Sequence, residues 1–290
     1  MLAKTEFDRI LCKAHMQHHL TNPFGYRSEN VQGHYPHYFS EEAFRSFLQE
    51  MEEHYPDAFS RYRSGKGSEL LERTEKGRTM PPKMASAASS SRFCYLSLRD
   101  GAHVLGGGKV TFEADCPVDG VRGTAPQMDA FSAEGAIFIE VKCHEIFDPH
   151  AISLSHQYRH WLCGKSNGFL LDIPESTPGE QIHIPLSAFN IGERCMLDIK
   201  QLLCHLMGIA SHACTSATLV YLFFKPLCAD PYDQAQIDAL FDALSEDIRK
   251  VFTSAPIARF CSANKIKLQA VAQNAPVMQA LRTDNLISLF

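Results

Sequence analysis

The chain has 290 residues, of which 45% are hydrophobic and 21% are charged, and its formal net charge is −5 with neutral histidines. This composition excludes wholesale disorder and provides enough apolar material for one large core. It also excludes a domain that binds nucleic acid through overall positive charge, because such domains are strongly basic. Any nucleic-acid partner would have to be steered by local basic patches.

The sequence carries no segment typical of export or membrane insertion. Lys4, Asp8 and Arg9 interrupt the apolar residues near the N-terminus, so no signal peptide is expected. No run of about 18 uncharged apolar residues occurs, so no membrane span is expected. The ten cysteines are scattered without a CxxC pair, which is typical of reduced thiols. These features predict a cytoplasmic protein with no membrane association.

The first 91 residues predict helices and a loop. Ser40 is a helix cap followed by an acidic first turn and an apolar stripe at helical spacing, formed by Phe44, Phe47, Leu48 and Met51. A second helix is expected from Ser68 to Lys76, ending at Gly77. The Pro-, Ala- and Ser-rich segment Met80–Ser91 predicts a loop.

The next 50 residues predict consecutive strands. They are expected at Arg92–Leu98, Lys109–Asp115, Pro126–Ser132 and Ala136–Lys142. Ala133–Gly135 is short enough to join the last two strands as a hairpin. Within the last strand, alternation places one apolar set on one face and Phe138, Glu140 and Lys142 on the other.

The remainder predicts alternating helices and strands after an insertion. Residues 148–194 are poor in strand patterns and are interpreted as that insertion, with a helix-like patch around Ser153–Cys163. The later elements are a helix at 197–210, a strand buried on both faces at 217–224, a helix after the Asp230 cap and Pro231, and a short strand at 266–272.

Asp129, Glu140 and Lys142 are the candidate catalytic residues. Two adjacent antiparallel strands can place Asp129 and Glu140 side by side, where the carboxylates repel each other unless a cation lies between them. Mg²⁺ prefers such hard oxygen ligands, and the carbonyl of Val141 could add a third oxygen. Lys142 emerges on the same face, where an ammonium could orient or deprotonate the attacking water or neutralise charge on phosphorus. The set therefore predicts metal-assisted hydrolysis of a phosphodiester.

The spacing Asp129-x10-Glu140-Val-Lys142 resembles the D…ExK signature of the PD-(D/E)XK, or restriction-endonuclease-like, nucleases. The expected element order of helix, three strands, helix and strand is similar to that family over about residues 65–225, although Pro126 stands three residues ahead of Asp129. The resemblance implies an α/β fold, with a central mixed sheet flanked by helices in the order αβββαβ and extra N- and C-terminal helices. It implies a nuclease domain at 65–290 and a helical extension at 1–64.

The resemblance also implies a cofactor, a substrate and supporting residues. The cofactor is Mg²⁺ or Mn²⁺, and the substrate is DNA, cleaved in restriction or repair. Glu69 is expected on the first core helix, reaching the metal through water with Glu72 behind it. Glu113 or Asp115 is expected to face the metal from the neighbouring strand, and Gln201 on the later helix is expected to support the site or the phosphate.

Several alternatives remain open from the sequence. Glu140 and Lys142 could form an ordinary surface salt bridge, and the chain could be a catalytically silent nucleic-acid-binding module or a hydrolase of another phosphoester. RNA remains open as a substrate and a homodimer as the assembly. Two other groups could bind metal: the histidines His15, His18, His19, His34 and His37, and the set Cys204, His205, His212 and Cys214. For the second set, the apolar phase of its helix favours core packing with an exposed histidine instead.

Overall fold

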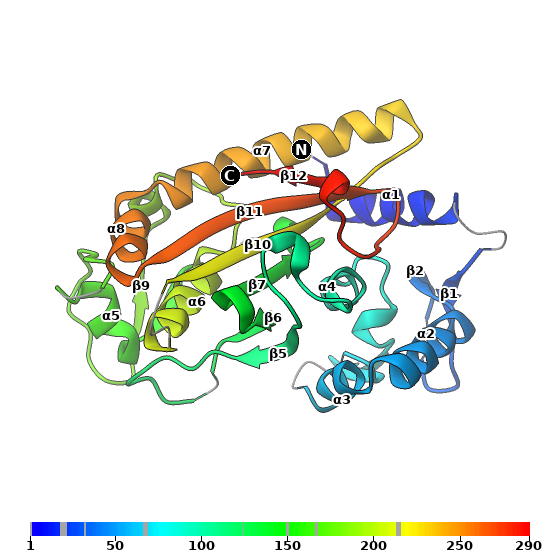
Figure 1. Cartoon of the computed structure of the whole chain (residues 1–290), viewed down its shortest axis with the longest axis horizontal. Helices are drawn as coiled ribbons and strands as arrows, with labels where there is room; N and C mark the ends of the chain where they lie inside the picture. The colour runs from blue at the N-terminus through cyan, green and yellow to red at the C-terminus, as the bar shows by residue number, and fades with distance from the viewer. Residues whose placement is uncertain are drawn as a thin grey trace.

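A six-stranded mixed sheet forms the centre of the computed structural model, which describes residues 2–17, 22–31, 33–65, 69–123, 125–148, 151–165, 168–212 and 216–290. The strand order is β12-β11-β10-β7-β6-β5 (Figure 1). Its strands are β5 (Thr111–Asp115), β6 (Gln127–Ser132), β7 (Ile137–Lys142), β10 (Ala217–Pro226), β11 (Ile266–Ala275) and β12 (Leu286–Ser288). Strands β5, β6 and β7 are antiparallel, β10 is parallel to β7 and to β11, and β12 is antiparallel to β11. The expectation of a mixed α/β fold around a central sheet is confirmed.

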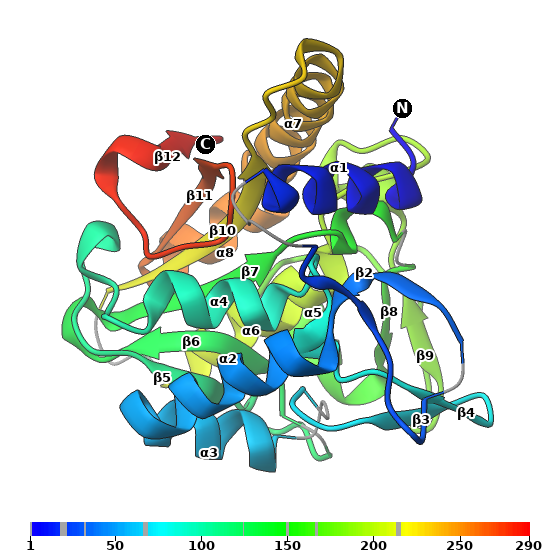
Figure 2. The same cartoon turned by 90° about the vertical axis from the view of Figure 1, so that its right-hand side faces the viewer.

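Helices cover both faces of this sheet (Figure 2). On one face, Phe93 of α4 (Ser90–Leu98) packs against Phe224 of β10 with ring centroids 5.1 Å apart. On the other face, α6 (Ile199–His212) buries its apolar side, and Phe252 at the end of α7 (Pro231–Phe252) contacts Tyr221. Helix α8 (Ala255–Asn264) then leads into β11. The central strands are therefore shielded from water on both sides.

The predicted strand at Arg92–Leu98 is wrong, because this segment forms α4. Ser89 caps the helix by accepting a hydrogen bond from the backbone N–H of Arg92 at 3.1 Å. Phe93, Cys94, Tyr95 and Leu98 are all fully buried. A helix buried on every side shows no amphipathic period, so its pattern was open to interpretation as a strand. The guanidinium of Arg92 is buried too, 4.1 and 4.0 Å from the ring centroids of Phe39 and Phe47.

The predicted helix at Ser68–Lys76 is also wrong, and its first residue lies outside the described residues. The segment forms a hairpin of β3 (Arg73–Glu75) and β4 (Arg78–Met80). Lys76 and Gly77 join the two strands, and both have positive φ angles, of 48° and 76°. Two such residues are typical of the tight turns that match the twist of a hairpin. The first helix of the core is thus α4, and Glu69 lies outside it. The expected loop at 80–91 includes a short 3₁₀ turn at Lys83–Ala85, and its last two residues begin α4.

Residues 1–64 combine helices with a small sheet. The helices are α1 (Lys4–Met16), α2 (Glu41–His54) and α3 (Pro56–Ser64), and the strands are β1 (Phe24–Tyr26) and β2 (Tyr35–Phe39). The Ser40 cap of α2 is confirmed, since its hydroxyl accepts the N–H of Ala43 at 3.2 Å. A purely helical description of this part is wrong because β1 and β2 pair. Its buried residues Phe7, Phe44 and Tyr62 belong to the same hydrophobic core as the sheet.

The elements predicted after residue 142 are mostly present. The described part of residues 148–194 carries α5 (Arg159–Cys163), the short paired strands β8 (Ser153–Ser155) and β9 (Gln181–His183), and two 3₁₀ turns. The expected helix at 197–210, strand at 217–224, helix after Pro231 and strand at 266–272 are confirmed as α6, β10, α7 and β11. Helix α8 and strand β12 were not predicted. Within the described ranges, no helix is long and apolar enough to cross a membrane.

We predict that Ser89→Ala destabilises the protein by about 1 kcal/mol, because it removes the side-chain cap of α4. Ser90→Ala is the matched control: the neighbouring serine makes no described hydrogen bond, so its loss should change the free energy of unfolding by less than about 0.5 kcal/mol. Urea denaturation measures both. Equal stabilities of the two variants would contradict the assigned cap.

Candidate active site

The β6–β7 hairpin brings Asp129 and Glu140 to one face of the sheet. The strands pair Ala130 with Ile139 and Phe131 with Phe138, whose ring centroids lie 4.6 Å apart. Asp129 lies two residues from Phe131 on β6, and Glu140 lies two residues from Phe138 on β7. Because side chains alternate along a strand, both carboxylates lie on the face of the sheet that carries the two phenylalanine rings. Just beyond the paired residues, Asp129 Oδ2 accepts the backbone N–H of Val141 at 2.7 Å. This bond fixes the Asp129 carboxylate beside the Glu140–Val141 peptide.

Glu140, Lys142 and Gln201 form a closed triangle of hydrogen bonds. Glu140 Oε1 accepts from Lys142 Nζ at 2.6 Å and from Gln201 Nε2 at 2.7 Å. Lys142 Nζ also donates to Gln201 Oε1 at 2.7 Å. Gln201 lies in the first turn of α6, where its backbone N–H donates to Asp198 Oδ1 at 3.0 Å. The helix therefore places the Gln201 amide against both charged groups, in the neighbourhood that the sequence predicted for it.

The second oxygen of Glu140 has no hydrogen-bond donor among the described residues. The side chain is only 2% exposed, so water cannot readily compensate. His205 Nε2 lies 3.7 Å away, but it also lies 3.2 Å from the carbonyl oxygen of Gln127. Because a carbonyl only accepts, that nitrogen carries its proton toward Gln127. Burial lowers the pKa of His205, which favours a neutral ring. Glu140 Oε2 is thus a buried acceptor without a partner, an arrangement that costs free energy.

Negative charge exceeds positive charge at this point of the sheet. Burial raises the pKa of Asp129 well above its usual value, and the neighbouring Glu140 raises it further. Burial alone would lower the pKa of Lys142, but Glu140 and Asp129 outweigh it and raise that pKa instead. One ammonium therefore faces two carboxylates, and an additional cation would relieve their repulsion.

Glu113 and Glu69 form a second acidic group next to the first. Glu113 lies between residues paired with Ala130 and Met128, but its φ of 50° is left-handed. Its Oε2 lies only 3.4 Å from the position that a Cβ on Gly65 would occupy, so the side chain reaches the end of α3. Burial raises the pKa of Glu113 to about 7, with further contributions from Glu69 and Glu140. Glu113 is thus coupled to the site, although its side chain is directed toward α3.

Glu69 is nearby but is placed differently from the expectation. It is buried in the segment before β3, and its Oε1 binds Lys83 Nζ at 3.2 Å. Glu72 binds Tyr26 and Ser28 and so anchors the N-terminal part of the chain. Asp115 is exposed and accepts from Gln127 Nε2 at 3.2 Å. The expectation that Glu69 lies on the first core helix is wrong.

A cavity of about 460 Å³ opens beside the triangle. Lys142, Gln201 and His205 line it, together with Lys200 and Glu145. Glu145 also accepts the backbone N–H of Cys143 at 2.8 Å, which fixes the turn after β7. Lys142 therefore borders the cavity, whereas the buried Glu140 is not among its lining residues.

His205 is the site residue that sequence reasoning missed. The sequence favoured an exposed histidine on α6, whereas His205 is buried beside Glu140. It follows Gln201 by four positions, and residues at that spacing share a helix face. Once Gln201 was assigned to the site, this spacing could have indicated His205.

Among the described residues, the other candidate metal groups do not assemble. His18, His19 and Cys214 lie outside the described residues. The His15 ring is buried at the edges of Phe24 and Phe39, with centroids 6.1 and 5.5 Å away. Across the described part of the chain, no group of three or more His, Cys, Asp or Glu side chains is arranged to hold a metal ion.

Comparisons with family models, curated proteins and solved structures found no match to this chain.

Proposed function

We propose that this chain is a divalent-metal-dependent nuclease of the PD-(D/E)XK type that hydrolyses phosphodiester bonds in DNA. One observation carries the proposal: Glu140 is buried beside Lys142 and Asp129, and one of its carboxylate oxygens receives no hydrogen bond from the described residues. A surface salt bridge would not bury both partners, yet the side chains of Lys142 and Glu140 are only 12% and 3% exposed.

The order of elements supports the same proposal. Helix α4, strands β5, β6 and β7, helix α6 and strand β10 occur in the order helix, three strands, helix and strand, with β8, α5 and β9 inserted between β7 and α6. This is the order that the resemblance implies, with α4 in place of the helix expected at 68–76. Asp129 lies on the second strand of the three, and Glu140 and Lys142 lie on the third.

The donor set fits a hard divalent cation. Glu140 Oε2 and the Asp129 carboxylate would hold Mg²⁺ or Mn²⁺, with the Val141 carbonyl as a further oxygen ligand. Such an ion would satisfy the unpaired oxygen and offset the repulsion that raises the pKa of Asp129. When bound, it would supply Lewis-acid chemistry, which polarises the phosphoryl oxygen and acidifies the attacking water.

The protein residues would position the reactants around that chemistry. Lys142 presents its ammonium group to the cavity, where it could hold a phosphate oxygen and neutralise charge that develops on it. Gln201 fixes the orientation of both Lys142 and Glu140 through its amide. We assign His205 a positioning role, since its neutral ring lies behind Glu140.

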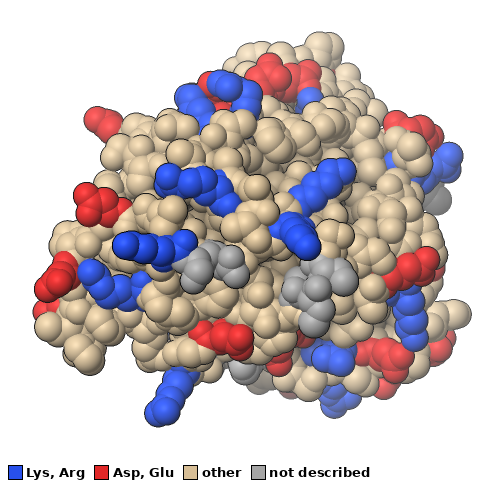
Figure 3. All heavy atoms as spheres, turned by 60° about the vertical axis from the view of Figure 1, so that its left-hand side comes forward, with Lys and Arg blue, Asp and Glu red and all other residues tan. Residues whose placement is uncertain are grey.

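The net charge of −5 does not oppose a polyanionic substrate, because charge is unevenly distributed. Figure 3 shows Lys and Arg side chains gathered on the face that carries α5 and α8 in Figure 1, with Asp and Glu mostly at its margin. Lys200 is exposed and lines the cavity beside Lys142. Local cations of this kind supply the phosphate contacts on which nucleic-acid affinity depends.

We predict that the purified protein cleaves DNA with Mg²⁺ or Mn²⁺, and that Asp129→Ala, Glu140→Ala and Lys142→Ala each abolish cleavage without unfolding the chain. Because removal of one partner leaves a buried charge unpaired, Asp129→Asn and Glu140→Gln should be tested beside them, with circular dichroism to verify folding. Gln201→Ala should reduce the rate roughly 10–100-fold, as expected for a residue that orients a ligand.

Substrates in this assay should include single-stranded DNA, duplex DNA and RNA of one sequence. A folded wild-type protein that cleaves none of them with either metal would contradict the proposal. Turnover of nucleotides or small phosphodiesters alone would instead indicate another phosphoesterase.

We further predict that Mn²⁺ binds the wild type and that Glu140→Gln weakens this binding by at least tenfold, because Glu140 supplies the unpaired oxygen. Glu134→Gln is the matched control, since Glu134 is an exposed acid in the turn of the same hairpin. Isothermal titration calorimetry measures both. Equal affinities for the two variants would place the metal elsewhere. Nucleic-acid binding without any metal binding would favour a catalytically silent module.

A further inference from the structure

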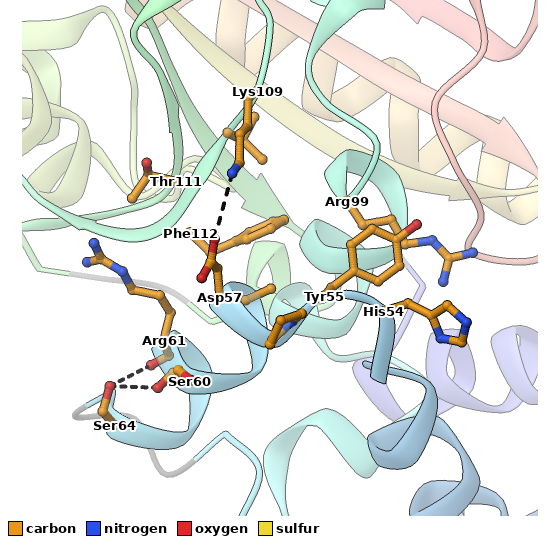
Figure 4. A pocket seen from close by; sticks show the side chains of 13 residues that line it. His54, Tyr55, Asp57, Ser60, Arg61, Ser64, Arg99, Lys109, Thr111 and Phe112 are labelled. Carbon is orange, nitrogen blue, oxygen red and sulfur yellow. Dashed lines mark hydrogen bonds and ion pairs between the residues drawn. The ribbon is translucent and has the colours of Figure 1, made fainter. Parts of the chain in front are cut away.

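The largest described cavity lies away from Lys142, on the outer side of β5. It encloses about 720 Å³ and lies between the α2–α3 turn, the end of α4 and the start of β5 (Figure 4). Its lining includes Tyr55, Asp57, Arg61, Arg99, Lys109 and Thr111. A cavity of this size is in the range of ligand-binding pockets, and nothing in the proposed chemistry accounts for it.

The charged side chains of this cavity are mostly cationic. Arg61, Arg99 and Lys109 line it, and Asp57 is the only acid among the lining residues. Figure 4 shows Arg61 rising from α3 and Lys109 reaching toward Asp57 from the opposite side. The result is a concave surface with a local excess of positive charge on a protein whose net charge is negative.

Two of these cations are available to an anionic ligand. Arg61 forms no ion pair within the described ranges. Lys109 and Asp57 lie 3.7 Å apart with their side chains 90% and 91% exposed, and such a pair contributes little and opens readily. Arg99 is more firmly held, since it donates to Glu50 at 2.8 Å and lies 5.4 Å from the Tyr55 ring centroid. Arg61 and Lys109 therefore form the recognition pair, with Arg99 behind them.

The cavity adjoins the acidic group through one strand. Val110, Thr111 and Phe112 form part of its wall, and Glu113 is the next residue of β5. Ser64 also lines the cavity, and Glu113 Oε2 lies close to the neighbouring Gly65. Burial and the charges of Glu69 and Glu140 raise the pKa of Glu113. A chain-like ligand that passed from the cations over β5 and β6 would reach the proposed cleavage site on β7.

We propose that this cavity binds the phosphodiester backbone of the nucleic-acid strand that flanks the cleavage point. The identity of the cleavage point rests on the proposed function. A polyanion with regularly spaced phosphates matches the two exposed cations Arg61 and Lys109 on opposite walls. Phosphate contacts of this kind fix the register of a nucleic acid without reading its sequence. Arg61 and Lys109 are thus substrate-binding residues, and Arg99 positions the wall behind them.

The test is DNA binding in EDTA, where cleavage cannot occur. Fluorescence anisotropy of a labelled oligonucleotide, single-stranded in one arm and duplex in the other, compares wild type, Arg61→Gln and Lys109→Gln. Arg63→Gln is the matched control: Arg63 is exposed on the same helix, but its guanidinium lies 5.7 Å from the Phe59 ring centroid and outside the cavity.

Each cavity variant should bind roughly three- to tenfold more weakly than the control at 0.1 M salt, and should reduce the slope of log K against log salt by about 1. The oligonucleotide, single-stranded or duplex, that loses more affinity identifies the form of DNA that the cavity binds. Cavity variants that bind like Arg63→Gln, or a wild type that binds neither form, would overturn the proposal. The wild type could cleave nothing with Mg²⁺ or Mn²⁺ while the cavity variants still bind DNA more weakly than the control. That result would support the binding surface and reject the proposal of nuclease activity.

Discussion

The burial of the Glu140 carboxylate is the constraint on which the site depends. Glu140 lies on β7, between β6 and β10 and beneath α6, and a charge in that position must be compensated by nearby groups. Lys142 and Gln201 compensate one oxygen of this carboxylate. Lys142 can do so because it lies on the same face of β7 as Glu140, and Gln201 because the first turn of α6 lies over that face. The other oxygen remains unpaired. An apolar side chain at this position would often give equal or greater stability than a buried charge. The geometry therefore favours a bound cation.

Much of this arrangement could be predicted from local patterns. Alternation in Ala136–Lys142 predicted the face that carries Glu140 and Lys142, and the tight link at 133–135 predicted the hairpin that brings Asp129 to it. The period of residues 197–210 predicted α6 and its Gln201. These elements are amphipathic or fully apolar, so their sequence patterns record which sides are buried.

The errors arose where burial does not follow a simple period or where contacts are distant in sequence. Helix α4 is buried all round, and β3–β4 depends on the left-handed turn at Lys76–Gly77. The direction of Glu113 is set by its own left-handed backbone and by α3, which lies about 50 residues earlier in the chain. Glu69 approaches the acidic group only through tertiary packing. The sequence therefore selected the central residues more reliably than their supporting neighbours.

The central claim is that a divalent cation completes the coordination of Glu140 and Asp129. A crystal soaked in Mn²⁺ tests it most directly, because anomalous scattering locates the ion independently of any activity. The account predicts a peak about 2.1 Å from Glu140 Oε2 that is shared with the Asp129 carboxylate. A fully soaked crystal with no peak there, and with a protein or water donor on Glu140 Oε2 instead, would contradict it.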